Sequence, residues 1–178
     1  MRWQRILAVI AALGAGPALA GQVVGNSYVG ARYGPLTIVP PAGAWRIVDQ
    51  EGSAGSEAGG PVVHLQMDQA IGGVYPVVQV SAVRKTEAAV TAAFILDTSR
   101  EAMIQRGGVP GPVEVSAADG RPVHSYRARI PVRGQAAEAV YVLLEGAGSF
   151  FVLQMVVPVA DYGEARARLD QLLTTLRY

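Results

Sequence analysis

Three β-prone stretches lie close together near the end of the chain and strongly limit the folds it can adopt. They are HSYRARIPVR (124–133), AEAVYVLLE (137–145) and SFFVLQMVV (149–157). The first alternates strictly, and a period of two places neighbouring side chains on opposite faces of a strand. Only Gly-Ala-Gly separates the second from the third, and Asp119-Gly120 precedes the first, so hairpins are expected at both places. Strands joined by hairpins predict an antiparallel sheet.

Two shorter β runs near the start are separated by prolines. Residues 36–38 and 45–47 flank Pro40, Pro41 and Gly43. Because proline has no backbone N–H, it ends a strand and favours a turn. We therefore expect the two runs to form an N-terminal hairpin, with Trp45 filling one end of the core.

Two further strands follow a glycine-rich loop. PVVHLQMDQ (61–69) places Val63, Leu65 and Met67 on one face and polar residues on the other. VYPVVQVSAVRK (74–85) continues the same pattern after a pair of glycines. These runs predict the third and fourth strands.

Two helices complete the expected order of elements. The alanine-rich run that begins at Thr86, a suitable N-cap, predicts a helix up to Arg106. Residues 161–178 predict a second helix, because Asp161 and Glu164 have the spacing of a capping box and an apolar stripe follows them. The order is ββββ-α-ββββ-α, which predicts an α+β fold with an antiparallel sheet flanked by helices.

The chain begins with the features of a secretory leader. Arg2 and Arg5 precede a short apolar run at 6–13, and Ala-Leu-Ala at 18–20 is a cleavage motif. A membrane anchor is the alternative, but the run is shorter than the roughly 20 residues of a spanning helix. The expected parts are a signal peptide at 1–20, a flexible N-terminal arm at 21–34 and a single domain at 35–178.

Charge and cysteine content narrow the classes of function. Removal of Arg2 and Arg5 with the leader leaves 13 basic against 14 acidic residues, without a basic block that would follow a phosphate backbone. Nucleic acid is therefore not an expected partner. The chain has no cysteine, so an exported form would be disulfide-free and would depend on its core. No later stretch is apolar enough to span a bilayer, so we expect a periplasmic or secreted protein without stable membrane insertion.

The order of elements resembles that of a known superfamily. The early PPAGAW (40–45), the strand DGRPVHSYRARI (119–130) and the closing LLTTLRY (172–178) are similar to the PsbP/Mog1/DcrB-like superfamily over residues 34–178. The resemblance implies an α/β/α sandwich around the antiparallel sheet. It also implies a mostly non-enzymatic role, because the superfamily contains accessory, assembly and partner-binding proteins, many of them exported by bacteria. It supplies no active site to transfer to this chain.

Candidate catalytic groups are few. Without cysteine or a G-x-S-x-G motif, nucleophilic catalysis would depend on His64 or His124 as the base. His64 and Asp68 share the polar face of one strand, but four positions along a strand span about 13 Å, which is too far to share a metal ion without other ligands. A solvated strand face is the simpler interpretation, and a polar site is the alternative. We expect no enzymatic activity, cofactor or metal.

Three arginines on one strand face are the most specific surface feature of the sequence. Arg127, Arg129 and Arg133 all alternate outward, and guanidinium groups bind carboxylates or phosphates through paired hydrogen bonds. The alternative is a solvated face paired with acids such as Glu138 or Glu145 on a neighbouring strand. Arg166 and Arg168 of the last helix are further candidates for partner contact.

Two functional hypotheses follow. The first is an exported, non-enzymatic accessory protein that binds another protein of the bacterial envelope. The second is a carrier that holds a small molecule or lipid between the sheet and a helix, which would require an enclosed apolar cavity on the order of 300 Å³.

Overall fold

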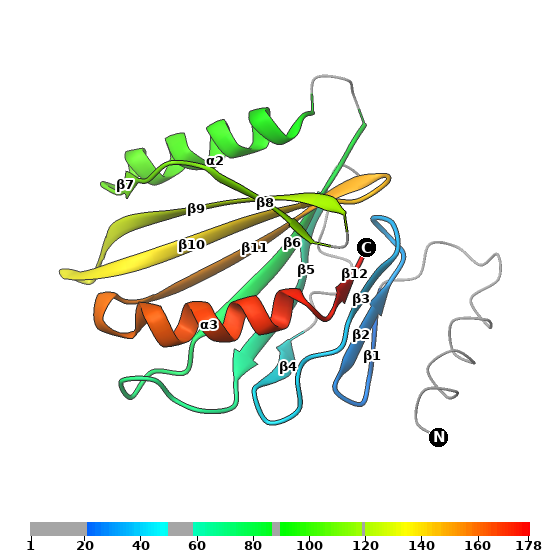
Figure 1. Ribbon diagram of the computed structural model, residues 1–178, viewed down its shortest axis with the longest axis horizontal. Coiled ribbons are helices and arrows are strands. Elements are labelled where there is room, and N and C mark those ends of the chain that lie inside the picture. The colour runs from blue at the N-terminus through cyan, green and yellow to red at the C-terminus, as the bar shows by residue number, and fades with distance from the viewer. Residues whose placement is uncertain (1–20, 50–58, 87–89, 119) are drawn as a thin grey trace.

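Two antiparallel sheets make up most of the computed structural model, which describes residues 21–49, 59–86, 90–118 and 120–178 (Figure 1). Within these residues the large sheet contains β4 (Trp45–Asp49), β5 (Gly59–Met67), β6 (Val77–Arg84), β7 (Val109–Pro110), β8 (Glu114–Ala118), β9 (Arg121–Val132), β10 (Gln135–Glu145) and β11 (Ser149–Pro158). The small sheet contains β1 (Gln22–Val24), β2 (Ser27–Gly30), β3 (Leu36–Ile38) and β12 (Leu176–Arg177). The helices are α2 (Ala92–Gln105) and α3 (Tyr162–Leu173), and the 3₁₀ turn η1 (Val159–Asp161) precedes α3.

The large sheet has the order β4-β5-β6-β11-β10-β9, and both β7 and β8 pair with the outer edge of β9. Its centre is the pair of hairpins β9–β10 and β10–β11, which pair antiparallel over most of their length. The hairpin predicted at Gly-Ala-Gly therefore forms, with Gly146 bonded back to Ser149. The predicted α+β fold with a mainly antiparallel sheet is confirmed.

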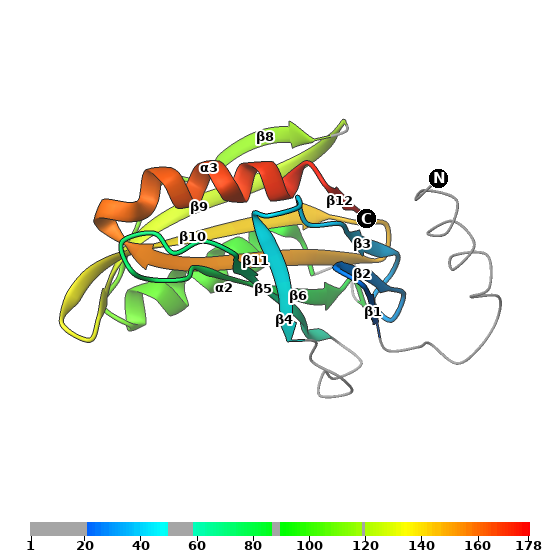
Figure 2. The same cartoon turned by 90° about the horizontal axis from the view of Figure 1, so that it is seen from below.

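The two helices pack on opposite faces of the large sheet (Figure 2). Tyr141 and Leu143 of β10 belong to the core beneath α2, whereas Val140 and Val142 belong to the core on the α3 side. The alternation of β-strand side chains explains how one strand contributes to both cores. The predicted inward faces of β5 and α3 are also buried on the α3 side; their residues are Val63, Leu65, Met67, Ala165, Leu169 and Leu172.

Trp45 is buried as predicted, but the prediction of an N-terminal hairpin is wrong. β3 pairs with β2 and β12 in the small sheet, whereas β4 pairs with β5 in the large one. Trp45 is 0% exposed, and its indole N–H donates a hydrogen bond to the backbone carbonyl of Arg168 in α3 at 3.1 Å. The prolines end β3, and the tryptophan then starts a strand of a different sheet.

The segment expected to be a flexible arm forms β1 and β2 of the small sheet. Tyr28 and Tyr33 are buried and fix it against the domain. The side-chain amide of Asn26 donates to the carbonyl of Trp45 at 2.9 Å and accepts from the N–H of Ile47 at 3.1 Å. Asn26 therefore bonds to the outer edge of β4 much as a neighbouring strand would.

The predicted helix ends differ from the structure. The N-cap of α2 is Thr91, whose hydroxyl accepts from the N–H of Phe94, rather than Thr86. Asp161 makes no side-chain cap bond, because η1 gives it a helical backbone (φ −98°, ψ −3°) instead of the extended one that capping requires. The closing helix ends at Leu173, and Leu176–Arg177 form β12 against β3.

Candidate functional site

Arg129 lies on the α3 side of β9 and is paired with a buried acid. Its Nε and Nη2 atoms donate to Oε1 of Glu138 on β10 at 3.3 and 3.1 Å. Glu138 is only 5% exposed, whereas the Arg129 side chain is 65% exposed. The cross-strand pairing that the sequence offered as an alternative therefore applies to Arg129, whose charge compensates a buried carboxylate.

Arg127 lies on the same face and has a different environment. It is exposed, and its guanidinium lies over the ring of Tyr162 at 5.5 Å from the ring centre. It forms no ion pair with a carboxylate of the residues that the structure describes. A cation–π contact leaves the N–H donors at the edge of the guanidinium available for an anion.

Arg133 is separate from the other two arginines. It is the first residue of the two-residue turn between β9 and β10, with φ 49°, and Gly134 follows with φ 80°. Positive φ at both central residues is the geometry of a type I′ hairpin turn. The prediction that Arg127, Arg129 and Arg133 share one strand face is therefore wrong, because the strand ends at Val132 and Arg133 lies in the turn.

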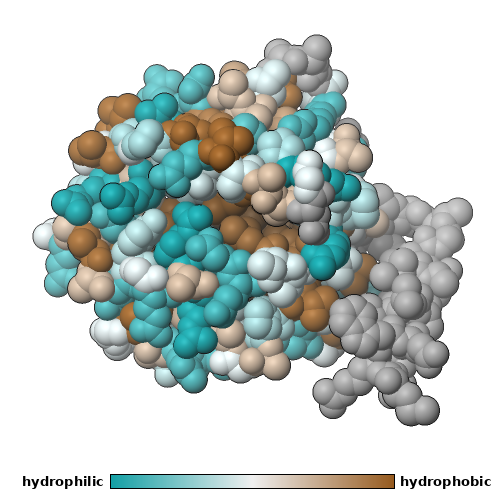
Figure 3. Space-filling view, in the orientation of Figure 1, coloured by the Kyte–Doolittle hydropathy of each residue, from teal (hydrophilic) through white to brown (hydrophobic). Residues whose placement is uncertain are grey.

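Two hollows adjoin Arg127, and we call them together the arginine groove. The first, of about 380 Å³, is lined by Val109, Gly111, Arg127, Arg129 and Glu138. The second, of about 340 Å³, is lined by Pro112, Glu114, Ser125, Tyr126, Arg127, Tyr162 and Arg166. Figure 3 shows a hollowed, hydrophobic area between β8 and α3, with hydrophilic residues beside it.

The arginine groove combines residues from distant parts of the chain. Tyr162 and Arg166 come from the first turns of α3, and Val109 and Glu114 come from the segment that pairs with the edge of β9. Among these only Arg166 was a sequence candidate, and it pairs with Asp170 at 2.9 Å. Tyr162 and Val109 carry no sequence signal for this site, because their role depends on tertiary position.

Among the described residues, His64 and Asp68 do not belong to a group of possible metal ligands. His64 is half-buried inside β5, opposite Gln79, whereas Asp68 is exposed beyond the end of the strand. Asp68 approaches Nε of Arg46 at 3.8 Å, and the same arginine donates to Gln66 at 2.7 Å. In the described part of the chain no three His, Cys, Asp or Glu side chains form a group that could hold a metal ion.

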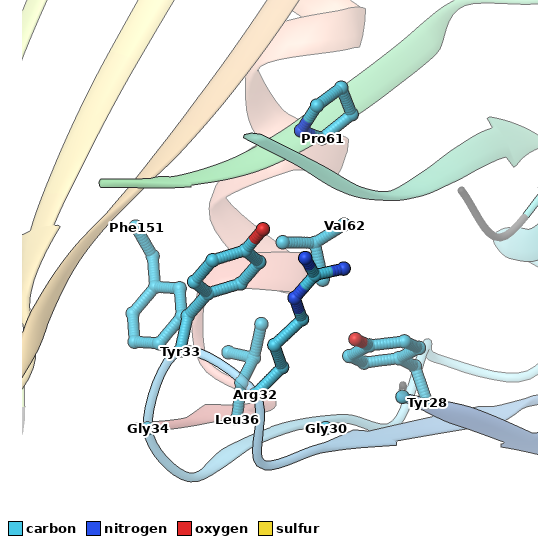
Figure 4. Close-up of a pocket in the computed structure, with 10 residues that line it drawn as sticks. Tyr28, Gly30, Arg32, Tyr33, Gly34, Leu36, Pro61, Val62 and Phe151 are labelled. Carbon is cyan, nitrogen blue, oxygen red and sulfur yellow. The ribbon is translucent and has the colours of Figure 1, made fainter. Parts of the chain in front are cut away.

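A small aromatic cavity lies where the small sheet meets β5 and β11 (Figure 4). Tyr33 is flanked by the guanidinium groups of Arg32 and Arg84, at 5.3 and 5.7 Å from its ring centre. Burial, followed by the neighbouring Tyr33, raises the pKa of Tyr28 to about 12. The cavity measures about 20 Å³, which is room for about one water molecule and supports a structural role.

A second buried polar cluster lies beneath α2. The Tyr126 hydroxyl donates to Oγ of Ser99 at 2.9 Å, and Ser99 donates to the carbonyl of Leu96 at 2.8 Å. The rings of Tyr126 and Tyr141 stack at 5.1 Å, and burial raises the pKa of Tyr141 to about 12 and also raises that of Tyr126. Both phenols thus keep their protons at neutral pH, so neither acts as a base toward Ser99.

No protein-family model and no curated protein sequence matches the chain. Solved structures do match. The cyanobacterial PsbP of Synechocystis sp. PCC 6803 superposes with a TM-score of 0.57 at 15% identity, over 92% of this chain and 95% of that one. The chain has a PsbP/Mog1-like fold.

Two further structures share this PsbP-like fold at low identity. LpqN of Mycobacterium tuberculosis, described as involved in cell envelope biogenesis, has a TM-score of 0.53 at 14% identity, covering 79% of this chain and 81% of LpqN. The protein PA94 of Pseudomonas aeruginosa, of unknown function, has a TM-score of 0.56 at 10% identity, covering 76% of this chain and 98% of PA94. Among the described residues, no helix is both long and apolar enough to cross a membrane.

Proposed function

We propose that this chain is a non-enzymatic accessory protein of the bacterial envelope that binds another envelope protein through the arginine groove. The leader-like residues 1–20 support export to the periplasm or beyond. The likeness in fold to PsbP and LpqN agrees with an accessory role outside the cytoplasm. We also interpret the packing of α2 and α3 on opposite faces as the outer layers of an α/β/α sandwich.

The observation that carries this proposal is the environment of the Arg127 guanidinium. This exposed guanidinium has no carboxylate partner among the described residues and is held over Tyr162 beside open hollows, so it is suited to bind an anionic group of a partner. Arginine and tyrosine are enriched where protein interfaces concentrate their binding energy. The groove is therefore better suited to protein contact than the single-water cavity beside Tyr33.

The carrier hypothesis has one observation in its favour. The hollow of about 340 Å³ lies between β9 and α3 and has the size of a small-ligand site. Its lining includes the charged side chains of Glu114, Arg127 and Arg166. A lipid tail would remove water from these charged groups, which is costly, so protein binding is favoured.

The experiment is an affinity capture from the envelope extract of the cells that produce the protein. The unchanged protein, Arg127→Ala and Arg133→Ala are compared, and bound proteins and lipids are identified by mass spectrometry. We expect one stoichiometric protein that is lost with Arg127→Ala and kept with Arg133→Ala, an equally charged change outside the groove. A lipid retained in place of any protein would contradict the proposal and support the carrier.

A further inference from the structure

The outer edge of β8 is open. Within the described residues, β8 pairs only with β9, and Glu114 to Ala117 are exposed, including Val115 at 65%. A strand edge of this kind presents backbone N–H and C=O groups that another extended segment can pair with.

The sequence of β8 lacks two of the usual protections of an edge strand. Edge strands are commonly blocked by lysine, proline or a covering element, and the sequence of β8, EVSAA, contains neither residue. At the other side of the sheet, the Asn26 side chain already occupies the edge of β4. Among the described residues, the β4 edge is thus occupied by the Asn26 side chain, whereas β8 is paired along one side only.

The open edge lies beside the arginine groove. Figure 2 shows β8 raised on the α3 side of the sheet. The register pairs Glu114 with Ser125, so Glu114 faces the groove side, and both residues line the hollow that contains Arg127. Because side chains alternate along a strand, every second side chain of a segment added to β8 would lie on the face of the sheet that carries this groove.

We propose that the occupant of the groove is an extended segment of a partner polypeptide that adds to β8 and places a carboxylate on Arg127. This inference rests on the proposed function and specifies its binding mode. The segment lies along the arginine groove while its backbone pairs with β8. Within the described residues Arg127 has no carboxylate partner, and its single positive charge, with Glu114 and Glu138 nearby, matches a single carboxylate rather than a polyanion such as nucleic acid.

The test uses a blocked, fluorescently labelled peptide of alternating valine and glutamate, and its matched counterpart with glutamine in place of glutamate. Binding is measured by fluorescence anisotropy with protein purified from the envelope of producing cells. We expect the glutamate peptide to bind more tightly than the glutamine peptide. Arg127→Ala should weaken the glutamate peptide about tenfold or more and remove the difference, since a charge-assisted hydrogen-bonded pair is lost. Arg133→Ala should change neither affinity.

Hydrogen exchange locates the bound peptide. The amides of β8, residues 114–118, should exchange more slowly in the peptide complex, whereas those of β4 should not change. Equal binding of the two peptides, equal losses in the two arginine variants, or binding without protection of β8 would each overturn the inference. Binding of anionic phospholipid vesicles in place of the peptide would overturn it as well.

The envelope capture separates this inference from the proposed function. If a partner is captured through Arg127 but the peptides fail, the accessory function stands and strand addition is wrong. If capture yields no protein for any variant, the accessory function itself is wrong.

Discussion

Replacing Trp45 tests how the large sheet is attached to α3. The side chain is fully buried, and its N–H bonds to the carbonyl of Arg168, which is 123 residues away in sequence. Trp45→Ala removes a large buried aromatic and leaves a cavity, which typically costs about 3–5 kcal/mol. For a domain of this size, that loss lowers the melting temperature by about 6–20 °C.

A second variant separates the hydrogen bond from the packing. Trp45→Phe keeps an aromatic ring in the core but removes the indole N–H that donates to the carbonyl of Arg168, and the loss of one hydrogen bond costs about 0.5–1.5 kcal/mol. We therefore expect Trp45→Phe to lie between the unchanged protein and Trp45→Ala. Tyr75→Ala serves as the control, because Tyr75 is 49% exposed and surface changes usually stay within about 0.5 kcal/mol.

The assay is urea and thermal unfolding followed by circular dichroism, because the substitution removes Trp45, the tryptophan whose fluorescence would report on the core. An unchanged melting curve for Trp45→Ala would refute the reasoning and would make Trp45 a surface residue. Equal losses for the alanine and phenylalanine variants would show that the hydrogen bond, not the volume, holds α3 in place.

Three other measurements test the buried polar groups and the hairpin turn. The pKa values of Tyr28 and Tyr141 are raised by burial from 10.0 to about 12, so stability should be constant below pH 10 and fall by about 3 kcal/mol per tyrosine as pH rises to 12. Unfolding at increasing pH measures this slope, which Tyr28→Phe and Tyr141→Phe should reduce; an unchanged slope would show that these phenols ionise freely. Arg129→Ala should destabilise the protein by about 1–3 kcal/mol, because it leaves Glu138 buried and unpaired. Adding Glu138→Gln should restore part of this loss, as measured by urea unfolding. Equal stability of Arg129→Ala and the unchanged protein would contradict the ion pair. Arg133→Gly should raise the free energy of unfolding by up to about 1 kcal/mol, because glycine adopts positive φ without steric cost. A lower free energy of unfolding would argue against the type I′ turn.

Local patterns in the sequence were sufficient to predict most strands of the large sheet. The alternation of Val63, Leu65 and Met67 predicted the buried face of β5, because a period of two is a property of the strand itself. The same reasoning identified the core face of α3. The start of α2 at Thr91 was missed, because Thr86 is an equally good N-cap in isolation. Which of the two threonines caps the helix depends on the tertiary structure.

Features that depend on distant contacts could not be predicted in this way. β12 is two residues long and exists because Leu176 pairs with Ile38 across most of the chain. The arginine groove likewise depends on Tyr162 of α3 approaching Arg127 of β9. Arg133 was assigned to a strand because its alternation is correct, and arginine is not a usual residue for positive φ.

The hydrogen bonds of Asn26 also bear on how large an assembly of this protein can become. A sheet grows without limit only if each molecule offers two free edges, one to donate to a neighbour and one to accept the next. Here the Asn26 side chain occupies the β4 edge of the large sheet, so copies of the chain cannot join head to tail from β8 to β4. Two copies that meet at β8 would instead form a closed dimer, because each presents the same edge to the other. Asn26 thus favours a complex of defined stoichiometry over an open fibre.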